Sequence, residues 1–247
     1  MGRAENKIAI VTGAARGLGA ATATLLVREG AKVLLTDLRD DEGEALAREL
    51  GRNALYQRHD VSRAEDWDRV MQTCTAAFGS PSVLVNNAGI SFFKPLVDLA
   101  ESDYRQIIDI DQVSVFLGMR AVVPSMKAVG GGSIINISSI AGLVGAPKVL
   151  PYVAAKFAVR DMSKAAAIEL APLNIRVNSV HPGFFDTPIN ARTPDNDAVL
   201  SSYTEAIPLG RIGRPEELAH MVLLLSTDEM TFATGAEFVI DGGVTCQ

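Results

Sequence analysis

The chain has few of the residues that build disulfides and metal sites. Its 247 residues include two cysteines, Cys74 inside a predicted helix and Cys246 next to the last position. Two cysteines so placed form no disulfide framework, which favours a reducing, cytoplasmic location. The three histidines, His59, His181 and His220, are scattered without the spacing of metal ligands. We therefore expect no metal in the mechanism, and we expect His181 to be packed rather than catalytic.

The chain also lacks an excess of positive charge and long apolar runs. The formal net charge is −6 and the sequence pI is about 5.1, which argues against nucleic acid or anionic membrane as a partner. No apolar run reaches the ~18 residues of a membrane span, and the first residues lack the arrangement of a signal peptide. With 48% hydrophobic and 21% charged residues, the composition is that of a soluble globular protein with a sizeable core.

Strand and helix patterns alternate along the chain. Short apolar runs predict strands at 8–11, 33–35, 55–61, 83–85, 133–137, 176–180 and 238–240. Helical spacing predicts helices at 20–28, 41–50, 62–78, 102–127 and 215–225, and a further helix that contains Tyr152. Apolar strands separated by helices indicate an α/β fold, a parallel sheet with helices on both faces. No linker or repeat interrupts the pattern, so we predict one doubly wound domain over residues 1–247.

Two local patterns refine this prediction. Ser62 and Glu65 have the spacing of a capping box, which predicts that the third helix begins there. The stretch 184–211 has weak periodicity and contains several proline and glycine residues. A long irregular segment in a compact domain is usually a binding loop, so we predict a mobile substrate loop over 184–211.

A glycine-rich turn joins the first predicted strand to the first predicted helix. Gly13, Gly17 and Gly19 follow the pattern Gly-x-x-x-Gly-x-Gly. Glycines at this place allow a tight turn and let backbone amides approach a pyrophosphate at the start of the helix. Glycine is common in such turns for conformational reasons alone, which is the alternative interpretation. The strand–turn–helix setting favours dinucleotide binding.

An acidic residue marks the end of the second predicted strand. Asp37 follows the glycines at a separation at which a carboxylate can accept both ribose hydroxyls of NAD. A solvated acid at a strand end is the alternative interpretation. Arg16 and Arg39 instead favour NADP, because a guanidinium binds a 2′-phosphate. A carboxylate and a phosphate repel at close range in a partly dry site, so we expect NAD as the cofactor and keep NADP as the alternative.

Tyr152 and Lys156 lie one helical turn apart, on the same face of a predicted helix. An ammonium group beside a phenol favours the phenolate and lowers its pKa from about 10. The pair therefore indicates a general acid and base for proton transfer to or from an alcohol oxygen. The same spacing also arises by chance, and only the rest of the chain decides between the two.

The motifs taken together resemble the short-chain dehydrogenase/reductase family in its compact form, which implies a Rossmann fold. The motifs that carry the resemblance are Thr12–Gly19, Asp60, Asn86–Gly89, Asn136–Ser139, Tyr152–Lys156, Pro182–Gly183 and Asp241–Gly243. Three segments are most similar to bacterial NAD-dependent hydroxysteroid and cyclic-alcohol dehydrogenases: Gly13–Gly19, Asn178–Gly183 and Thr234–Glu237.

The resemblance implies roles for individual residues. Tyr152 is the implied acid and base, and Ser139 and Tyr152 bind the substrate oxygen. Tyr152 and Lys156 also bind the cofactor, and Lys156 holds the nicotinamide ribose. The adenosine and pyrophosphate site is implied at Gly13, Arg16, Gly17, Leu18, Gly19, Asp37, Leu38, Asp60, Val61, Asn87, Ala88 and Gly89. The nicotinamide is implied to lie along Pro182, Gly183, Phe185 and Thr187. The alternative interpretation is that the Asn87 side chain forms an Asx-type cap and that Thr187 caps a helix.

One position departs from the family pattern. Phe116 fixes the register of the long predicted helix, and the position of the family's catalytic asparagine is then Asp111. A backbone carbonyl remains there to order a water for the proton relay, but a carboxylate cannot donate a hydrogen bond. An ionised Asp111 near Lys156 would screen the ammonium and raise the pKa of Tyr152. We expect an active enzyme whose oxidation optimum lies at higher pH.

The predicted pocket wall is apolar and has no arginine or lysine placed to bind a substrate carboxylate or phosphate. It comprises Ser91, Phe92, Phe93, Ile140, Leu143, Val144, Leu150, Phe184, Ile189 and Tyr203. The alternative interpretation is that the aromatic residues of this wall belong to the hydrophobic core. An uncharged apolar secondary alcohol or ketone, cyclic or steroid-like, is the expected substrate.

Three functional classes follow. The first is an NAD-dependent oxidoreductase acting on secondary alcohols and ketones, which we expect. The second is an NADPH-dependent ketone or 3-oxoacyl reductase. The third is a catalytically silent nucleotide-binding protein, which only Asp111 favours. By resemblance, the fifth and sixth helices pair the chain into a homotetramer or homodimer.

Overall fold

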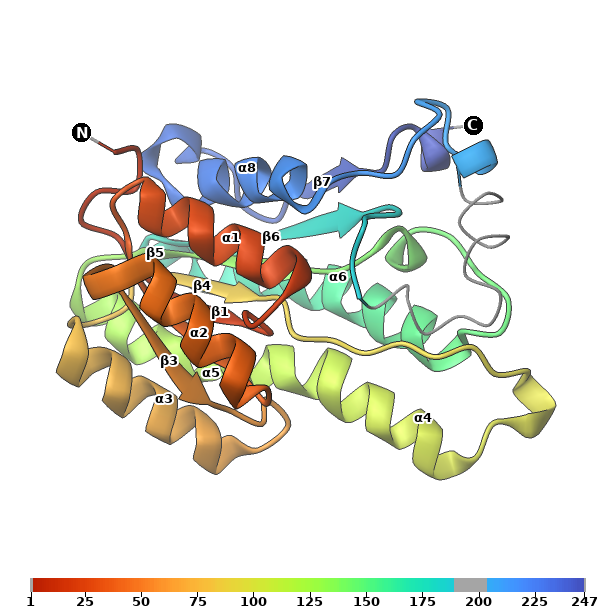
Figure 1. The fold of residues 1–247 in the computed structure, drawn as a ribbon, viewed down its shortest axis with the longest axis horizontal. Coiled ribbons are helices and arrows are strands. Elements are labelled where there is room, and N and C mark those ends of the chain that lie inside the picture. The colour runs from red at the N-terminus through yellow and green to blue at the C-terminus, as the bar shows by residue number, and fades with distance from the viewer. Residues whose placement is uncertain (1, 189–203, 247) are drawn as a thin grey trace.

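A computed structural model describes residues 2–188 and 204–246. The described residues form one sheet of seven strands in the order β3-β2-β1-β4-β5-β6-β7, and every strand pair is parallel (Figure 1). The strands are β1 Ile8–Thr12, β2 Lys32–Asp37, β3 Ala54–Arg58, β4 Val83–Asn86, β5 Gly132–Ile137, β6 Ile175–Pro182 and β7 Glu237–Ile240. The predicted doubly wound α/β sheet of Rossmann type is confirmed. A single domain over residues 1–247 stays a prediction.

Helices cover both faces of this sheet (Figure 1). They are α1 Gly17–Arg28, α2 Asp40–Leu50, α3 Ala64–Ala77, α4 Glu101–Ile108, α5 Ser114–Ala128, α6 Leu150–Leu170 and α8 Pro215–Ser226. Because side chains alternate along a strand, Ala9 and Val11 pack toward α1 and α8, whereas Ile10 packs toward α3 and α5. Both faces are therefore buried, which explains the continuous apolar runs in the strands. Among the described residues, no helix combines the length and hydropathy needed to cross a bilayer.

The strand order reverses between β1 and β4. The chain moves outward from β1 through β2 to β3, and then returns to the other side of β1 with β4. Crossover helices leave this point in opposite directions, so the carboxyl ends of β1 and β4 border an open crevice. Thr12 at the end of β1 and Asn87 just after β4 meet there.

The helix predicted at 102–127 is longer and less regular than expected. A π-helical segment, Asp109–Val113, joins α4 to α5, and the helical backbone continues without a break through Ser114. Asp111 lies in this segment and is completely buried. π-helical turns are uncommon and occur often at functional sites.

Two predictions of local structure near the end of β3 are wrong. The strand ends at Arg58 rather than at residue 61, and α3 begins at Ala64 without a side-chain cap. Ser62 does not cap the helix, because its hydroxyl donates to Asp60 Oδ1 at 2.6 Å and its N–H donates to the same oxygen at 3.0 Å. The local turn around Asp60 therefore replaces the capping box.

Only part of the predicted loop 184–211 lies among the described residues. Phe185 is 4% exposed and forms an isolated β-bridge with Gly213, and the N–H of Asp186 donates to the Gly213 carbonyl at 2.9 Å. The first residues of the loop are thus held to the segment before α8. Ile189 and Tyr203 of the predicted pocket wall lie outside the described residues.

Candidate active site

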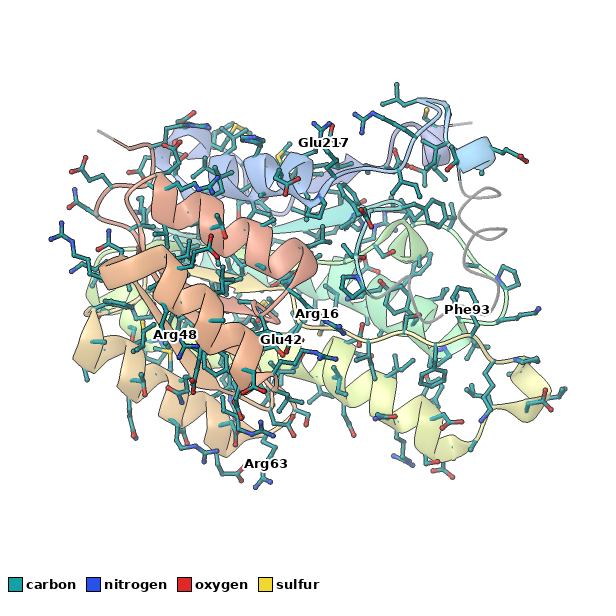
Figure 2. All side chains as sticks on the ribbon, viewed as in Figure 1. Arg16, Glu42, Arg48, Arg63, Phe93 and Glu217 are labelled. Carbon is teal, nitrogen blue, oxygen red and sulfur yellow. The ribbon has the colours of Figure 1, made fainter. Side chains whose placement is uncertain are left out.

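A cavity of about 740 Å³ opens at the carboxyl ends of the strands. Arg16, beside the start of α1, and Phe93, in the loop that leads toward α4, both line it and lie well apart in Figure 2. Of the predicted site residues, the cavity is lined by Gly13, Arg16, Gly17, Leu18, Asp37, Leu38, Asp60, Val61, Asn87, Ala88, Gly89, Asp111, Ser139, Tyr152, Lys156, Pro182, Gly183, Phe185 and Thr187. The chain therefore brings nearly all of them together at one edge of the sheet.

The glycine-rich turn is held by the residues that follow β4. The amide of Asn87 donates to the carbonyls of Thr12 and Gly13 at 2.8 and 3.1 Å. Gly13 has φ +63°, and a Cβ there would lie 2.8 Å from the Ala88 Cα. Gly19 does not line the cavity. It packs behind the turn, where a Cβ would lie 2.2 Å from the Gly13 carbonyl oxygen. The cradle thus requires glycine for close backbone approach.

The start of α1 faces the cavity next to this turn. Its first turn, from Gly17, contains no acidic side chain, so the partial positive charge of the helix N-terminus is not offset there. A backbone cradle of this kind at a helix start fits a pyrophosphate. Thr187 lies across from Gly17, because a Cβ on that glycine would come within 3.5 Å of the Thr187 side chain.

Asp37 fixes the other end of the cradle through backbone hydrogen bonds. Its carboxylate accepts the N–H groups of Ala15, Leu38 and Arg39 at 3.1, 2.7 and 3.2 Å. A carboxylate has about four acceptor sites, so roughly one remains for a ligand hydroxyl. Asp37 therefore both shapes the pocket and presents a negative charge to it.

Ser139, Tyr152 and Lys156 meet at the opposite end of the cavity. Ser139 follows β5, and its Oγ accepts the N–H of Ala141 at 3.1 Å. The ammonium of Lys156 lies 5.3 Å from the centre of the Tyr152 ring, as expected for one helix face. Lys156 is 3% exposed and donates to the Ile137 carbonyl at 3.1 Å. The phenol, the hydroxyl and the ammonium share one wall of the cavity.

Burial and two neighbouring charges determine the electrostatics of Tyr152. Burial raises the pKa of Tyr152, Lys156 opposes this rise, and the Asp111 carboxylate adds to it. The net direction is upward because desolvation outweighs the ammonium. The directions predicted for Lys156 and for Asp111 agree with the structure, and the contribution of burial is what the sequence-based reasoning left out.

Asp111 is the charge partner of Lys156. Its Oδ2 lies 3.3 Å from Lys156 Nζ, and its Oδ1 accepts the N–H of Ile90 at 2.9 Å. Burial raises the pKa of Asp111, while Lys156 opposes that rise. Burial acts to lower the pKa of Lys156, but Asp111 and Tyr152 raise it, and the net direction is upward.

His181 supports Ser139 from behind. It is completely buried, with Nδ1 3.0 Å from the Ser139 carbonyl oxygen and Nε2 2.9 Å from Ser179 Oγ. Since a carbonyl only accepts, Nδ1 carries the proton and Nε2 accepts from the Ser179 hydroxyl. Burial lowers the pKa of His181, so the ring stays neutral at pH 7. As predicted, His181 is packed, and its hydrogen bond fixes the backbone of Ser139.

Two polar residues near the cavity escaped the sequence-based reasoning. Ser138 donates from Oγ to the Lys156 carbonyl at 2.9 Å, which joins β5 to α6, and it lies inside a motif that was already noted. His59 lines the cavity near Asp37 and is 1% exposed. Its Nδ1 lies 3.0 Å from Thr36 Oγ1, and its Nε2 has no hydrogen-bond partner among the described residues. The one sequence signal for His59 was that it directly precedes Asp60, which was already assigned to the cofactor site.

The end of the cavity that holds Ser139 and Tyr152 has an apolar lobe. Its wall includes Ser91, Phe93, Ile140, Val144, Ala146, Pro147, Val149 and Phe184. Phe92, Leu143 and Leu150 do not line the cavity, in contrast to the prediction. The basic side chains in the described lining are Arg16 and Arg39 at the nucleotide end, and Lys156, which Asp111 pairs. Within the described ranges, no three His, Cys, Asp or Glu side chains group as a metal site.

Comparisons with known proteins agree with this geometry. A family model described as enoyl-(acyl carrier protein) reductase matches residues 13–245. The 3-alpha-(or 20-beta)-hydroxysteroid dehydrogenase of Mycobacterium tuberculosis is 46% identical over 242 residues, which cover 98% of this chain and 90% of the relative.

Two further relatives are similar over almost their whole length. The cyclopentanol dehydrogenase of Comamonas testosteroni is 42% identical over 248 residues, covering 99% of both chains. The NADP-dependent (R)-specific alcohol dehydrogenase of Lentilactobacillus kefiri is 42% identical over 250 residues, again covering 99% of both. The family expected from the motifs is thereby confirmed, and the chain belongs to the short-chain dehydrogenase/reductase family.

Proposed function

We propose that the chain is an NAD-dependent dehydrogenase that interconverts apolar secondary alcohols and ketones, with Tyr152 as its acid and base. Membership of the family makes it a nicotinamide-dependent oxidoreductase that acts on CH–OH groups. The observation that carries the proposal is the meeting, in one cavity, of the glycine cradle at one end with Ser139, Tyr152 and Lys156 at the other.

The proposed cofactor site uses both ends of the cavity. The backbone of the glycine-rich turn and the start of α1 hold the pyrophosphate, and Asp37 accepts from the adenosine ribose. Lys156 holds the nicotinamide ribose. When bound, the nicotinamide supplies the hydride chemistry. The cradle that a Cβ at Gly13 or Gly19 would fill supports this fit.

The proton step falls to the residues of this chain. In the oxidation direction, the Tyr152 phenolate would take the hydroxyl proton of the alcohol, and a nicotinamide held in this cavity would supply the hydride-accepting chemistry that converts the alcohol to a ketone. The Ser139 hydroxyl hydrogen-bonds the substrate oxygen and stabilises its developing negative charge. The neutral His181 keeps the Ser139 backbone in place.

NAD is the proposed cofactor, and NADP is the alternative. The Asp37 charge opposes a 2′-phosphate, while Arg16 in the same lining attracts one. The Lentilactobacillus kefiri relative is NADP-dependent by name. Titration of the purified protein with NADH and with NADPH tests this choice. Binding of NADPH tighter than that of NADH would contradict it.

An uncharged, apolar and cyclic substrate is proposed because the lobe beside Ser139 and Tyr152 is apolar and its single basic residue is already paired. Relatives named for hydroxysteroids and for cyclopentanol support this class. A panel of cyclic, linear and carboxylated secondary alcohols, assayed with both cofactors, tests it. The proposal fails if carboxylated or linear alcohols give higher kcat/KM than the cyclic ones.

The proposed assembly is a homotetramer, with a homodimer as the alternative. Large apolar side chains lie exposed on α6 and beyond it, with Ile168 79% exposed and Phe232 fully exposed. The Arg120 guanidinium lies 5.3 Å from the ring of Phe116 on α5, which is also about half exposed. Light scattering on the purified protein distinguishes these states. The acidic charge and two free cysteines support a proposed cytoplasmic location.

A further inference from the structure

Asp111 and Lys156 form a buried ion pair beside Tyr152. The side chain of Asp111 is 0% exposed and that of Lys156 is 4% exposed, with 3.3 Å between Oδ2 and Nζ. Charges so well removed from water are weakly screened. The π-helical segment Asp109–Val113 is what directs Asp111 inward at this point.

The two oxygens of Asp111 have different surroundings. Oδ1 accepts the N–H of Ile90, whereas Oδ2 faces the ammonium of Lys156 and has no hydrogen-bond partner among the described residues. Gly89 makes room for Oδ2, because a Cβ there would lie 2.8 Å from that oxygen. Oδ2 therefore interacts with the site through the charge of Lys156.

Few other polar groups face the Asp111–Lys156 pair. From α6, Tyr152 and Lys156 face the pair. The ends of β4 and β5 contribute the Ile90 N–H, the Ile137 carbonyl and the Ser139 hydroxyl, which are uncharged. His181 lies behind Ser139 as a neutral ring. Among the described residues, the charged side chains that act on the Tyr152 hydroxyl are thus Lys156 and Asp111.

We propose that Asp111 is a positioning residue that offsets the charge of Lys156, so that alcohol oxidation requires a higher pH and ketone reduction is favoured near neutrality. This inference rests on the proposed role of Tyr152 as acid and base. With Lys156 alone, the phenolate has an adjacent positive partner. With Asp111 ionised, much of that support is cancelled, and the protonated phenol, which reduction needs, persists to higher pH.

The sign of the pH effect follows from the protonation state that each direction requires. Oxidation needs the phenolate, so its rate rises with pH through the pKa of Tyr152, and Asp111 moves that rise upward. Reduction needs the protonated phenol, so its rate falls through the same pKa. Removal of the Asp111 charge moves both transitions to lower pH, by about one pH unit for a neighbouring buried charge.

Asp111→Asn is the direct test, and Asp109→Asn is its matched control. Both remove one carboxylate charge from the same π-helical segment, but Asp109 is exposed and Asp111 is buried. The profiles of kcat/KM against pH are measured in both directions with saturating cofactor. We expect the Asp111→Asn midpoints to move to lower pH by about one unit, and the Asp109→Asn midpoints to stay with those of the parent protein.

A second readout does not depend on turnover. A near-ultraviolet difference titration of the cofactor-free protein follows phenolate formation, and a Tyr152→Phe background assigns the Tyr152 transition. We expect that transition to move to lower pH in Asp111→Asn as well. If Asp111→Asn does not fold, Asp111→Ser removes the same charge and keeps an acceptor for the Ile90 N–H, and the same shift is expected.

The outcomes separate this inference from the proposed function. Unchanged midpoints in both readouts overturn the role of Asp111, even if the protein oxidises alcohols. A shifted Tyr152 titration in a protein that turns over no alcohol or ketone supports the effect on Tyr152 and overturns the proposed function. Equal shifts in Asp109→Asn and Asp111→Asn also overturn the inference, because they would show a general charge effect.

Discussion

The two ends of the cavity satisfy their polar groups in opposite ways. At the nucleotide end, Asn87 and Asp37 spend their hydrogen bonds on the backbone of the glycine-rich turn. At the reacting end, Tyr152, Lys156 and Asp111 are titratable groups that act on one another through charge. The proposed nucleotide end is therefore held in one shape by hydrogen bonds, whereas the proposed reacting end consists of groups that can change protonation state.

Tyr152→Phe gives the largest expected effect and isolates the reacting end. The substitution removes the proton acceptor and leaves the cradle intact, so kcat should fall by roughly a thousandfold. Binding of NADH, followed by fluorescence titration, should stay within a factor of a few of the parent protein. Loss of NADH binding together with kcat would show that the two ends are not separable.

His59 is a buried titratable side chain at the proposed nucleotide end. It therefore tests the contrast between the two ends. Burial lowers the pKa of His59 from 6.5 to about 4, so the unfolded chain binds a proton first as the pH falls. Its contribution to stability is complete above pH 6.5 and is lost as the pH falls toward 4, by about 3 kcal/mol at ~1.36 kcal/mol per pKa unit.

Urea unfolding between neutral pH and pH 4 measures this loss. A His59→Gln variant should show a flatter dependence of the unfolding free energy on pH, whatever its absolute stability. His220→Gln is the matched control because His220 is exposed. Parallel curves for His59→Gln and the parent protein would contradict the assignment.

Gly19→Ala isolates the nucleotide end by steric means. The added methyl would lie 2.2 Å from the Gly13 carbonyl, so the turn must shift. Overpacking of this kind costs about 1–3 kcal/mol, and we expect NADH affinity to fall by roughly thirtyfold. In the variant, the difference titration of Tyr152 should stay unchanged. Gly145→Ala is a control, since a Cβ there meets nothing within 4 Å.

Asp37→Ser gives the smallest expected effect and sharpens the choice of cofactor. The change removes the negative charge that opposes a 2′-phosphate and leaves Arg16 in place. The ratio of NADPH to NADH affinity should rise about tenfold, which corresponds to about 1.4 kcal/mol. An unchanged ratio, measured by titration with both cofactors, would mean that Asp37 acts only by shaping the turn.

The sequence predicted those parts of the site that depend on local geometry. One helical turn placed Tyr152 and Lys156 on one face, and the glycine spacing located the cradle. Properties that depend on packing between distant elements were out of reach. The net pKa of Tyr152 depends on burial, and the partners of His59 come from β2 and α3.

Local signals also failed where two of them competed. Ser62 has the spacing of a helix cap, but its hydroxyl donates to the carboxylate of Asp60 instead. The π-helical segment Asp109–Val113 left no pattern in the sequence, because the residues on both sides continue an ordinary helical repeat. In the structure, both α4 and the π-helical segment pack against α6, which is distant in the sequence.

That segment acts as a one-residue insertion in an otherwise α-helical rod. Removal of a single residue from 109–113 would restore regular α-helical winding, at about 100° per residue, and would change the faces of the residues inside the segment while α4 and α5 keep nearly their present phase. Asp111 would then rotate away from Lys156, although every other side chain of the site would keep its identity. The length of this stretch, and not only its composition, is therefore part of the chemistry.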